Sequence, residues 1–175
     1  MSELFSIQLQ NRQQQGRDGV WLDLPTTTEQ VQAALRQIDI SSDNPQGLFI
    51  SGYFAEEEKR IAIPYNMVLA SNVDELNFLA ARLETLSAGE RAELNAALQT
   101  PQSEFSSIGR ITDFPENVDY YVHLPDVRGP AQLGDYYLNR SGMVDMPEEW
   151  KGGIDTAQFG RYVAQQEQGV FTEYG

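Results

Sequence analysis

The chain has 175 residues, of which 41% are hydrophobic and 10% aromatic, so it is long and apolar enough to bury one or more cores. It contains 26 Asp and Glu residues against 12 Lys and Arg residues, which gives a formal net charge of −14. Such a charge repels nucleic acids and membrane surfaces, which are anionic, and attracts basic partners. The absence of cysteine and of any apolar run of roughly 20 residues predicts a cytoplasmic protein without disulfide bonds.

The negative charge is spread along the chain. Residues 1–60 carry a net charge of −4, residues 61–105 carry −4 and residues 106–175 carry −6. A spread charge predicts an acidic surface on folded modules rather than an acidic tail. Acidity is also typical of proteins that only need to stay in solution, so charge alone does not identify a partner.

The N-terminal third predicts a small sheet. Residues 5–10, FSIQLQ, place hydrophobic side chains at every second position, as a half-buried strand does. Residues 20–25, VWLDLP, repeat this pattern, with Trp21 and Asp23 on the face opposite the leucines. The two segments predict a hairpin, and residues 47–54, GLFISGYF, predict a third strand.

A helix is predicted between the second and third strands, over residues 28–38, where hydrophobic residues recur at helical spacing. Thr26 and Glu29 have the spacing of a capping box at its start. The acidic run at 55–60, AEEEKR, predicts an exposed turn. Glu56, Glu57 and Glu58 could supply oxygen ligands, but the run lacks the spaced acids of a calcium loop, so no metal site is predicted.

The middle of the chain predicts two helices. The first lies within residues 72–86, NVDELNFLAARLETL, with Asn72 as the N-cap residue. Ser87 and Glu90 have capping-box spacing at the start of the second helix, and Pro101 ends it.

The last third predicts mixed structure. Residues 118–124, VDYYVHL, predict a strand, and residues 130–142 predict a helix that stops at a glycine. Residues 146–149 are typical of a helix start, and residues 169–174, GVFTEY, predict a closing strand. The chain is therefore expected to be an α+β protein of three small modules: residues 1–62 with a sheet and one helix, residues 63–105 helical, and residues 106–175 mixed.

No motif of a known catalytic site is evident. His123 is the single histidine, and a lone histidine is more often structural than catalytic. A pair of carboxylates could catalyse glycoside hydrolysis, but 26 acids allow many pairs and the sequence gives no separation between them. An enzyme is therefore the weaker hypothesis.

The aromatic residues have two interpretations. Tyr120–Tyr121 and Tyr136–Tyr137 are adjacent pairs, and Phe159 and Tyr162 share a helix face if their segment is helical. These rings could fill a core, or they could form a surface for a partner or a second copy, where aromatic residues concentrate. Phe159, Tyr162 and Phe171 are expected to close the core of the third module.

Several blocks of the chain resemble the ArdA family of antirestriction proteins. The matching segments are residues 72–86, residues 113–150 and residues 154–175. The most specific block has an Asp, an aromatic-Gly-Arg group and a Gly-x-aromatic-Thr group, which here are Asp155, Phe159-Gly160-Arg161 and Gly169-Val170-Phe171-Thr172. The cores at Glu75–Leu83 and Leu133–Tyr137 match as well, and GVWLDLP near the N-terminus fits more loosely.

The resemblance implies a DNA mimic encoded on a plasmid or conjugative element. Such a protein occupies the DNA-binding groove of type I restriction-modification enzymes, and it needs neither catalysis nor a cofactor. The resemblance also implies an elongated chain of modules, a homodimer, and carboxylates spaced like phosphates. An alternative is an acidic adaptor or inhibitor of another basic DNA-binding protein.

The candidate site that follows from the resemblance is collective. The acids expected to imitate phosphates are Glu56, Glu57, Glu58, Asp74, Glu75, Glu84, Glu90, Glu93, Asp113, Glu116, Asp119, Asp126, Asp135, Asp145, Glu148, Glu149 and Asp155. Asp74 and Glu75 also lie in the first turn of a predicted helix, where acids stabilise the helix itself. The residues expected at a dimer interface are Leu133, Tyr136, Tyr137, Phe159 and Tyr162.

Overall fold

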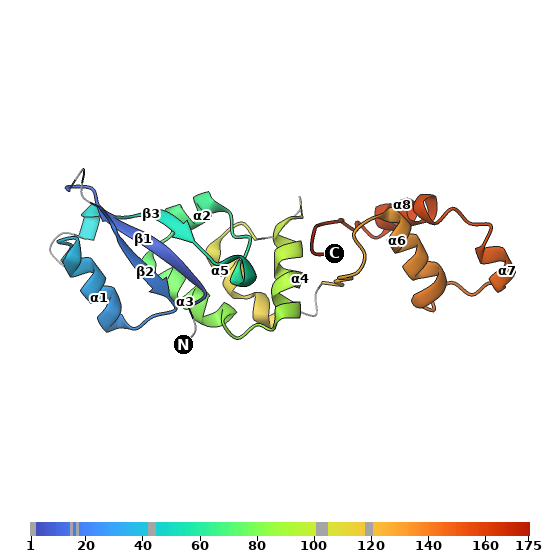
Figure 1. Ribbon diagram of the computed structural model, residues 1–175, viewed down its shortest axis with the longest axis horizontal. Helices are drawn as coiled ribbons and strands as arrows, with labels where there is room; N and C mark the ends of the chain where they lie inside the picture. Colours follow the sequence, from blue (N-terminus) through green and yellow to red (C-terminus); the bar gives the residue numbers. More distant parts are fainter. Residues whose placement is uncertain (1–2, 15, 17, 42–44, 101–104, 118–120) are drawn as a thin grey trace.

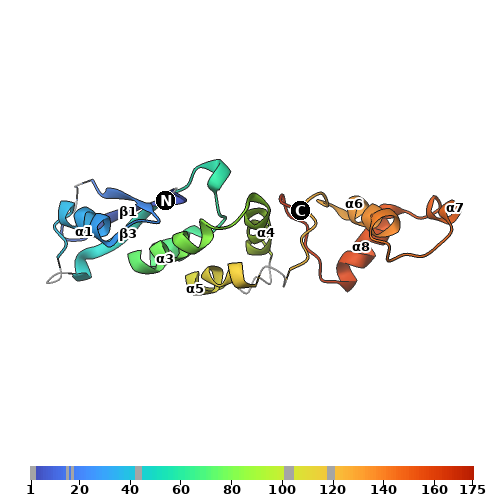
Figure 2. The same cartoon turned by 90° about the horizontal axis from the view of Figure 1, so that it is seen from below.

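The computed structural model describes residues 3–14, 16, 18–41, 45–100, 105–117 and 121–175. The molecule is elongated, with a sheet at one end and a group of helices from the last third of the chain at the other (Figure 1). A view from below shows the same extended arrangement (Figure 2). The combination of an antiparallel sheet with helices confirms the α+β fold class.

The sheet consists of β1 (Phe5–Asn11), β2 (Val20–Leu24) and β3 (Leu48–Phe54). Its order is β2-β1-β3 and both pairings are antiparallel, which confirms the predicted hairpin and third strand. Alternate residues of β1 are buried because a period of two places them on one face of the sheet. The register shifts between Gln8 and Leu9, where β3 carries an irregularity typical of a bulge.

Helix α1 (Thr28–Gln37) confirms the predicted helix but begins with a different capping box. The Thr27 side chain accepts a hydrogen bond from the Gln30 backbone, and the Gln30 side chain accepts one from Thr27. The box therefore starts one residue later than the predicted Thr26. Both backbone groups of Thr26 are bonded to the Asn77 side chain, which fixes this residue outside the helix.

One short helical turn precedes the third strand and another follows it. A 3₁₀ turn, η1 (Pro45–Gly47), precedes β3, and a second, η2 (Glu57–Lys59), follows it within the acidic run. Glu56 and Glu57 are exposed there, as predicted for a solvated turn.

The central helices are α2 (Tyr65–Ala70), α3 (Val73–Leu83) and α4 (Ala88–Leu98). Asn72 caps α3 by accepting a hydrogen bond from the Glu75 backbone. The capping box at the start of α4 is formed by the predicted pair, Ser87 and Glu90.

One continuous core joins the sheet to these helices. Leu9 of β1 and Leu79 of α3 are both fully buried in it, together with Phe114. Phe114 belongs to a 3₁₀ turn, η3 (Phe114–Glu116), which follows α5 (Ile108–Thr112). Because α5 packs on α3, the described residues from 3 to 117 form one packed unit, called here the N-terminal body. The division into three modules at residues 62 and 105 stays a prediction.

Two asparagines act as connectors inside the N-terminal body. The Asn77 amide of α3 bonds to both backbone groups of Thr26, at 2.7 and 3.0 Å. The Asn95 amide of α4 accepts from the Ala62 N–H at 2.7 Å and donates to the Arg60 carbonyl at 3.0 Å. Each amide therefore satisfies a backbone segment that has no strand beside it.

The remaining helices form the C-terminal unit, defined here as residues 122–175, because the Tyr121 ring packs on Phe105 and Phe114 of the N-terminal body. They are α6 (Pro130–Asp135), the π-helical turn η5 (Tyr136–Arg140), α7 (Glu148–Lys151) and α8 (Thr156–Gln166). Gly142, at φ 70°, follows η5 and confirms the predicted glycine stop, since positive φ favours glycine.

Two glycines allow α6 and α8 to touch backbone to backbone. A Cβ atom added to Gly160 would lie 1.8 Å from the Pro130 carbonyl oxygen, and one added to Gly134 would lie 1.9 Å from the Thr156 carbonyl oxygen. Both distances are far below van der Waals contact, so neither position accepts a side chain in this arrangement. The close crossing leaves a small core of three buried residues, Val127, Leu133 and Val163.

Two strand predictions in the last third were wrong. Residues 121–124 and residues 169–174 are irregular, while residues 118–120 of the first predicted strand lie outside the described part. The two segments meet through a side chain rather than through the backbone hydrogen bonds of a sheet. The His123 Nε2 atom lies 2.9 Å from the Tyr174 carbonyl oxygen. Alternation of hydrophobic residues is typical of a half-buried strand, but a strand also needs partners for its backbone N–H and C=O groups.

The expectation for the tail aromatics was right for two of the three residues. Phe159 and Phe171 pack against the small core of the C-terminal unit. Tyr162 does not, because its side chain is 60% exposed. The tail then returns to the N-terminal body, where Gln99 donates a hydrogen bond to Glu173 at 2.9 Å, and its end lies beside α4 (Figure 2).

Candidate functional site

The predicted acids are mostly at the surface. None of those whose side chains are described is buried. The exposed ones are Glu56, Glu57, Asp74, Asp113, Glu116, Asp126, Asp145, Glu148, Glu149 and Asp155. The half-buried ones are Glu75, Glu84, Glu90, Glu93 and Asp135. Asp119 and the side chain of Glu58 lie outside the described part.

Glu90 and Asp155 each have a local structural task. Glu90 accepts a hydrogen bond from the Ser87 backbone at 2.7 Å, and hydrogen bonds from the Ser87 side chain and backbone lower the pKa of Glu90. Asp155 caps α8 by accepting from the Gln158 backbone at 3.0 Å. Carboxylates at helix starts satisfy backbone N–H groups and the helix dipole, so their positions follow partly from folding.

Several other acids take part in exposed ion pairs. Glu56 pairs with Lys59 at 3.2 Å and Glu148 with Lys151 at 2.6 Å, each within one helical turn. Glu116 of η3 pairs with Arg82 of α3 at 2.6 Å, and Asp135 pairs with Arg140 at 3.4 Å. Exposed pairs of this kind contribute about 0–1 kcal/mol to the free energy of unfolding, so a competing cation can replace them at little cost.

The composition limits how many acids can be neutralised. Even if each of the 12 basic residues paired with one carboxylate, 14 of the 26 carboxylates would have no cation of this chain beside them. Together with the exposure of the acids, this gives a surface whose charge is largely available to a basic partner.

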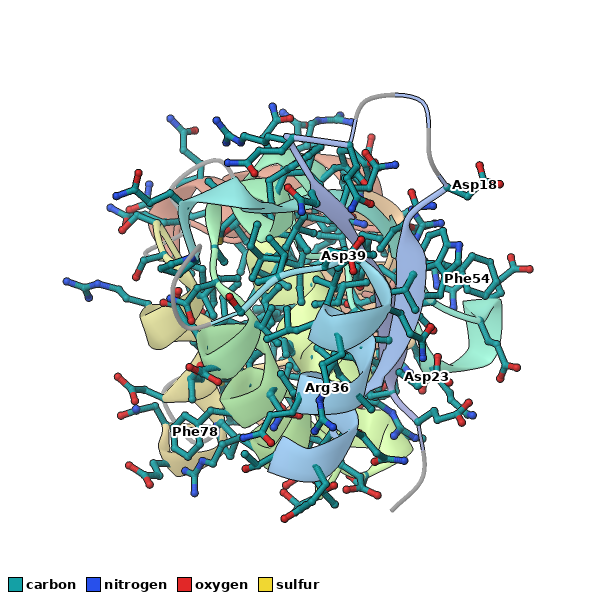
Figure 3. All side chains as sticks on the ribbon, turned by 90° about the vertical axis from the view of Figure 1, so that its left-hand side faces the viewer. Asp18, Asp23, Arg36, Asp39, Phe54 and Phe78 are labelled. Atoms are coloured by element: carbon teal, nitrogen blue, oxygen red, sulfur yellow. The ribbon has the colours of Figure 1, made fainter. Side chains whose placement is uncertain are left out.

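Sequence reasoning left several exposed acids out of the candidate site. They are Glu3, Asp18, Asp23, Glu29, Asp39, Glu167 and Glu173. Figure 3 looks at the sheet end of the molecule and shows Asp18 and Asp23 projecting from the same side as Phe54. The alternation of residues 20–25 already separates Asp23 from the buried leucines, so this acid could have been recognised from its strand.

Two features of the described part of the chain bear on catalysis: the lack of a metal-binding group and the position of the single histidine. In the described part of the chain, no group of three or more His, Asp or Glu side chains could hold a metal ion. His123 contacts the Tyr174 carbonyl group at the junction between the N-terminal body and the C-terminal unit. A shallow hollow of about 460 Å³ lies beside the β1–β2 loop, where Arg12 covers the Phe49 ring at 5.4 Å.

The tyrosines Tyr53 and Tyr137 have raised pKa values. Burial raises the pKa of Tyr53 to about 12. Burial and a hydrogen bond to Glu167, at 2.8 Å, raise the pKa of Tyr137 to about 12. Neither Tyr53 nor Tyr137 therefore adds negative charge at neutral pH. Across the described residues, the helices are too short or too polar for any of them to cross a membrane.

The residues expected at a dimer interface differ in exposure. Leu133 is buried in the core of the C-terminal unit, while Tyr136, Tyr137 and Phe159 are partly buried against that core. Tyr162 is exposed, as are Met143 at 73% and Trp150 at 66%. The C-terminal unit thus has a small interior and several large hydrophobic side chains in solvent.

These features define an elongated α+β protein whose notable surface property is distributed, incompletely neutralised carboxylates. Residues 15–175 match the family described as Antirestriction protein (ArdA). Because this match spans nearly the whole sequence, the chain belongs to the ArdA family of antirestriction proteins, whose partners are restriction enzymes. A comparison with curated proteins found no match.

Proposed function

We propose that this protein blocks type I restriction-modification enzymes by occupying their DNA-binding groove as a mimic of duplex DNA. The observation that carries the proposal is the combination of an elongated fold (Figure 1) with exposed carboxylates in both the N-terminal body and the C-terminal unit. Such an inhibitor binds stoichiometrically and performs no reaction, and membership of the ArdA family supports an antirestriction role.

The charge has the right scale for this role. Duplex DNA carries one negative charge per roughly 1.7 Å of axis, so a net charge of −14 corresponds to roughly 24 Å of duplex. Phosphate contacts position a protein on DNA without reading its sequence. A protein that offers only phosphate-like charges can therefore compete for the groove without presenting any bases.

A homodimer formed through the C-terminal unit would double the charge. The exposed side chains of Met143, Trp150 and Tyr162 support this arrangement, because large exposed hydrophobic groups mark association surfaces. Light scattering of Tyr162→Glu tests it. We expect this variant to be monomeric at concentrations where the unaltered protein is a dimer, and a persisting dimer would remove Tyr162 from the interface.

The proposal places the protein in the cytoplasm of a host that carries a plasmid or conjugative element, where incoming DNA meets restriction enzymes. The direct test is cleavage of unmodified DNA by a purified type I enzyme in the presence of increasing amounts of this protein. We expect cleavage to stop near one equivalent per DNA-binding site. A type II endonuclease on the same DNA is the control, and equal inhibition of both would indicate a less selective acidic inhibitor.

Cleavage that continues unchanged at a large excess of protein would contradict the type I target. In that case an acidic inhibitor of another basic DNA-binding protein becomes the better explanation. Both mechanisms use the same surface, so the identity of the inhibited enzyme decides between them.

A further inference from the structure

The outer face of the sheet has an unusual composition for an exposed surface. Its inner face packs on the helices of the N-terminal body, while Trp21 of β2 is 50% exposed and Phe54 of β3 is 58% exposed on the other side. The ladder pairs Ser6 with Asp23 on one side and with Phe54 on the other. Asp23, Ser6 and Phe54 therefore form one row across the three strands.

The next row brings Trp21 into the same area. Gln8 pairs with Trp21 on one side and Gly52 on the other. A Cβ atom added to Gly52 would lie 3.1 Å from the Trp21 Cη2 atom, so the indole reaches across β1 to the third strand. Because Gly52 has no side chain, it leaves room for the Trp21 ring. Trp21 thus lies across the sheet beside the row that holds Asp23 and Phe54.

The carboxylate beside these rings is held in place. The Ser6 hydroxyl donates a hydrogen bond to the Asp23 Oδ1 atom at 2.6 Å, and the Asp23 side chain remains exposed. In Figure 3 Asp23 and Phe54 project from the same side of the molecule, while Phe78 of α3 projects from the opposite side. The face therefore combines two accessible aromatic rings with one oriented negative charge.

We propose that Trp21, Asp23 and Phe54 form an anchoring site for an arginine side chain of the target enzyme. A guanidinium group binds well over an indole ring and pairs with a carboxylate, and it does both more readily than an ammonium group. A groove that binds DNA must present such cations to the phosphates. The net charge of −14 makes a basic partner the complementary occupant of this face.

This inference rests on the proposed function and adds to it a binding hot spot, a small site that contributes a large share of the binding free energy. Diffuse charges steer the approach of the partner, whereas aromatic residues and arginine dominate interface hot spots. The site would thus add one strong contact to a surface on which each carboxylate contributes little.

Competition for labelled DNA bound to a purified type I methyltransferase tests the inference. We expect Trp21→Ala to raise the concentration needed for displacement by about tenfold or more, and Phe54→Ala by several-fold. Phe78→Ala is the matched control, since Phe78 is also a largely exposed phenylalanine, at 62%, but lies on the other side. We expect this control to change displacement by less than about twofold.

The salt dependence separates the two parts of the site. Trp21→Ala should lower the affinity for the enzyme without changing how steeply the logarithm of the affinity falls with the logarithm of the salt concentration, because the change removes no charge. Asp23→Asn should make this dependence on salt shallower, because it removes one charge. The amide oxygen of the new side chain can still accept the hydrogen bond from Ser6. Circular dichroism melting of each variant confirms that the sheet is intact.

The outcomes separate this inference from the proposed function. If the unaltered protein fails to displace DNA, the proposed function fails. If it displaces DNA and both Trp21→Ala and Phe54→Ala behave like Phe78→Ala, only the anchoring site is overturned. Conversion of a dimer to a monomer by Trp21→Ala, in light scattering, would also overturn it by showing that a second copy covers this face.

Discussion

The N-terminal body and the C-terminal unit are held together in different ways. The N-terminal body buries side chains from three strands and several helices in one continuous core. In the C-terminal unit the described core holds three buried residues, and its main helices meet through Gly134 and Gly160. The comparison shows that the two parts of one chain can be held together differently. The N-terminal body relies on buried hydrophobic side chains, and the C-terminal unit relies on backbone contact at glycines.

This difference has a consequence for association. A unit with a small interior leaves more hydrophobic surface in solvent, here including Trp150 and Tyr162. The N-terminal body has a larger interior, and it exposes Trp21 and Phe54 on the outer face of its sheet. Mutations in the two regions should therefore act on different properties.

The largest effect is expected from Gly160→Ala. The added methyl group would overlap the Pro130 carbonyl group, which is backbone and cannot rotate away. We expect the C-terminal unit to lose its helix packing, at a cost of about 3 kcal/mol or more, while the N-terminal body stays folded. Hydrogen exchange measured by mass spectrometry should show lost protection confined to residues 122–175. Gly152→Ala, where nothing lies within 4 Å, is the control, and equal protection in both variants would refute the glycine contact.

A comparable loss of stability in the N-terminal body requires the removal of most of a buried side chain. Leu79 is fully buried in α3, so Leu79→Ala should lower the free energy of unfolding of this body by about 2–5 kcal/mol. Denaturant unfolding followed by far-UV circular dichroism measures this change. A loss below 1 kcal/mol would mean that the core is looser than the structure shows.

A smaller effect is expected at the start of α4. Ser87→Ala removes the N-cap hydroxyl that accepts from the Glu90 backbone, which should cost about 1 kcal/mol. The same denaturant measurement applies, with Ser107→Ala at the start of the shorter α5 as a second cap for comparison. An unchanged free energy of unfolding would exclude the cap as a stabilising feature.

The capping carboxylate adds a pH dependence of known sign. The folded pKa of Glu90 is lowered by hydrogen bonds from Ser87, so its contribution is present above the ordinary glutamate pKa, 4.5, and is lost as pH falls through the folded pKa. Glu90→Gln keeps an acceptor but does not titrate. The stability difference between the two proteins should be constant near pH 7 and shrink below pH 4.5. A difference that grows as the pH falls would have the wrong sign.

The smallest effect is expected from single carboxylates of the acidic surface. Glu149→Gln changes one exposed charge in 26 acids, so inhibition of a type I enzyme should change by less than about twofold. Titration of the cleavage reaction measures it. A tenfold loss would show that inhibition depends on one acid rather than on the collective charge.

Much of the N-terminal body was predictable because its signals are local. The alternation in residues 5–10 and 20–25 identified the hairpin, and Ser87 with Glu90 identified the start of a helix. The capping box of α1 was misplaced by one residue because a distant side chain, Asn77, holds Thr26. Local spacing carries no information about such a contact.

The C-terminal unit was less predictable because its structure depends on contacts between distant segments. Residues 169–174 alternate like a strand, yet they meet residue 123 through an imidazole group. Gly160 was visible in a family motif, but its role needs the position of Pro130, on another helix. The exposure of the acids followed from their chemistry, whereas the aromatic row on the sheet required the strand register.

The measurement that tests the central claim most directly is displacement of labelled target DNA from a purified type I methyltransferase at two salt concentrations. If the protein imitates the phosphate backbone, it should displace DNA near stoichiometric amounts, and its own affinity for the enzyme should weaken steeply with salt. Displacement that fails at low salt, or an affinity that does not change with salt, would contradict DNA mimicry.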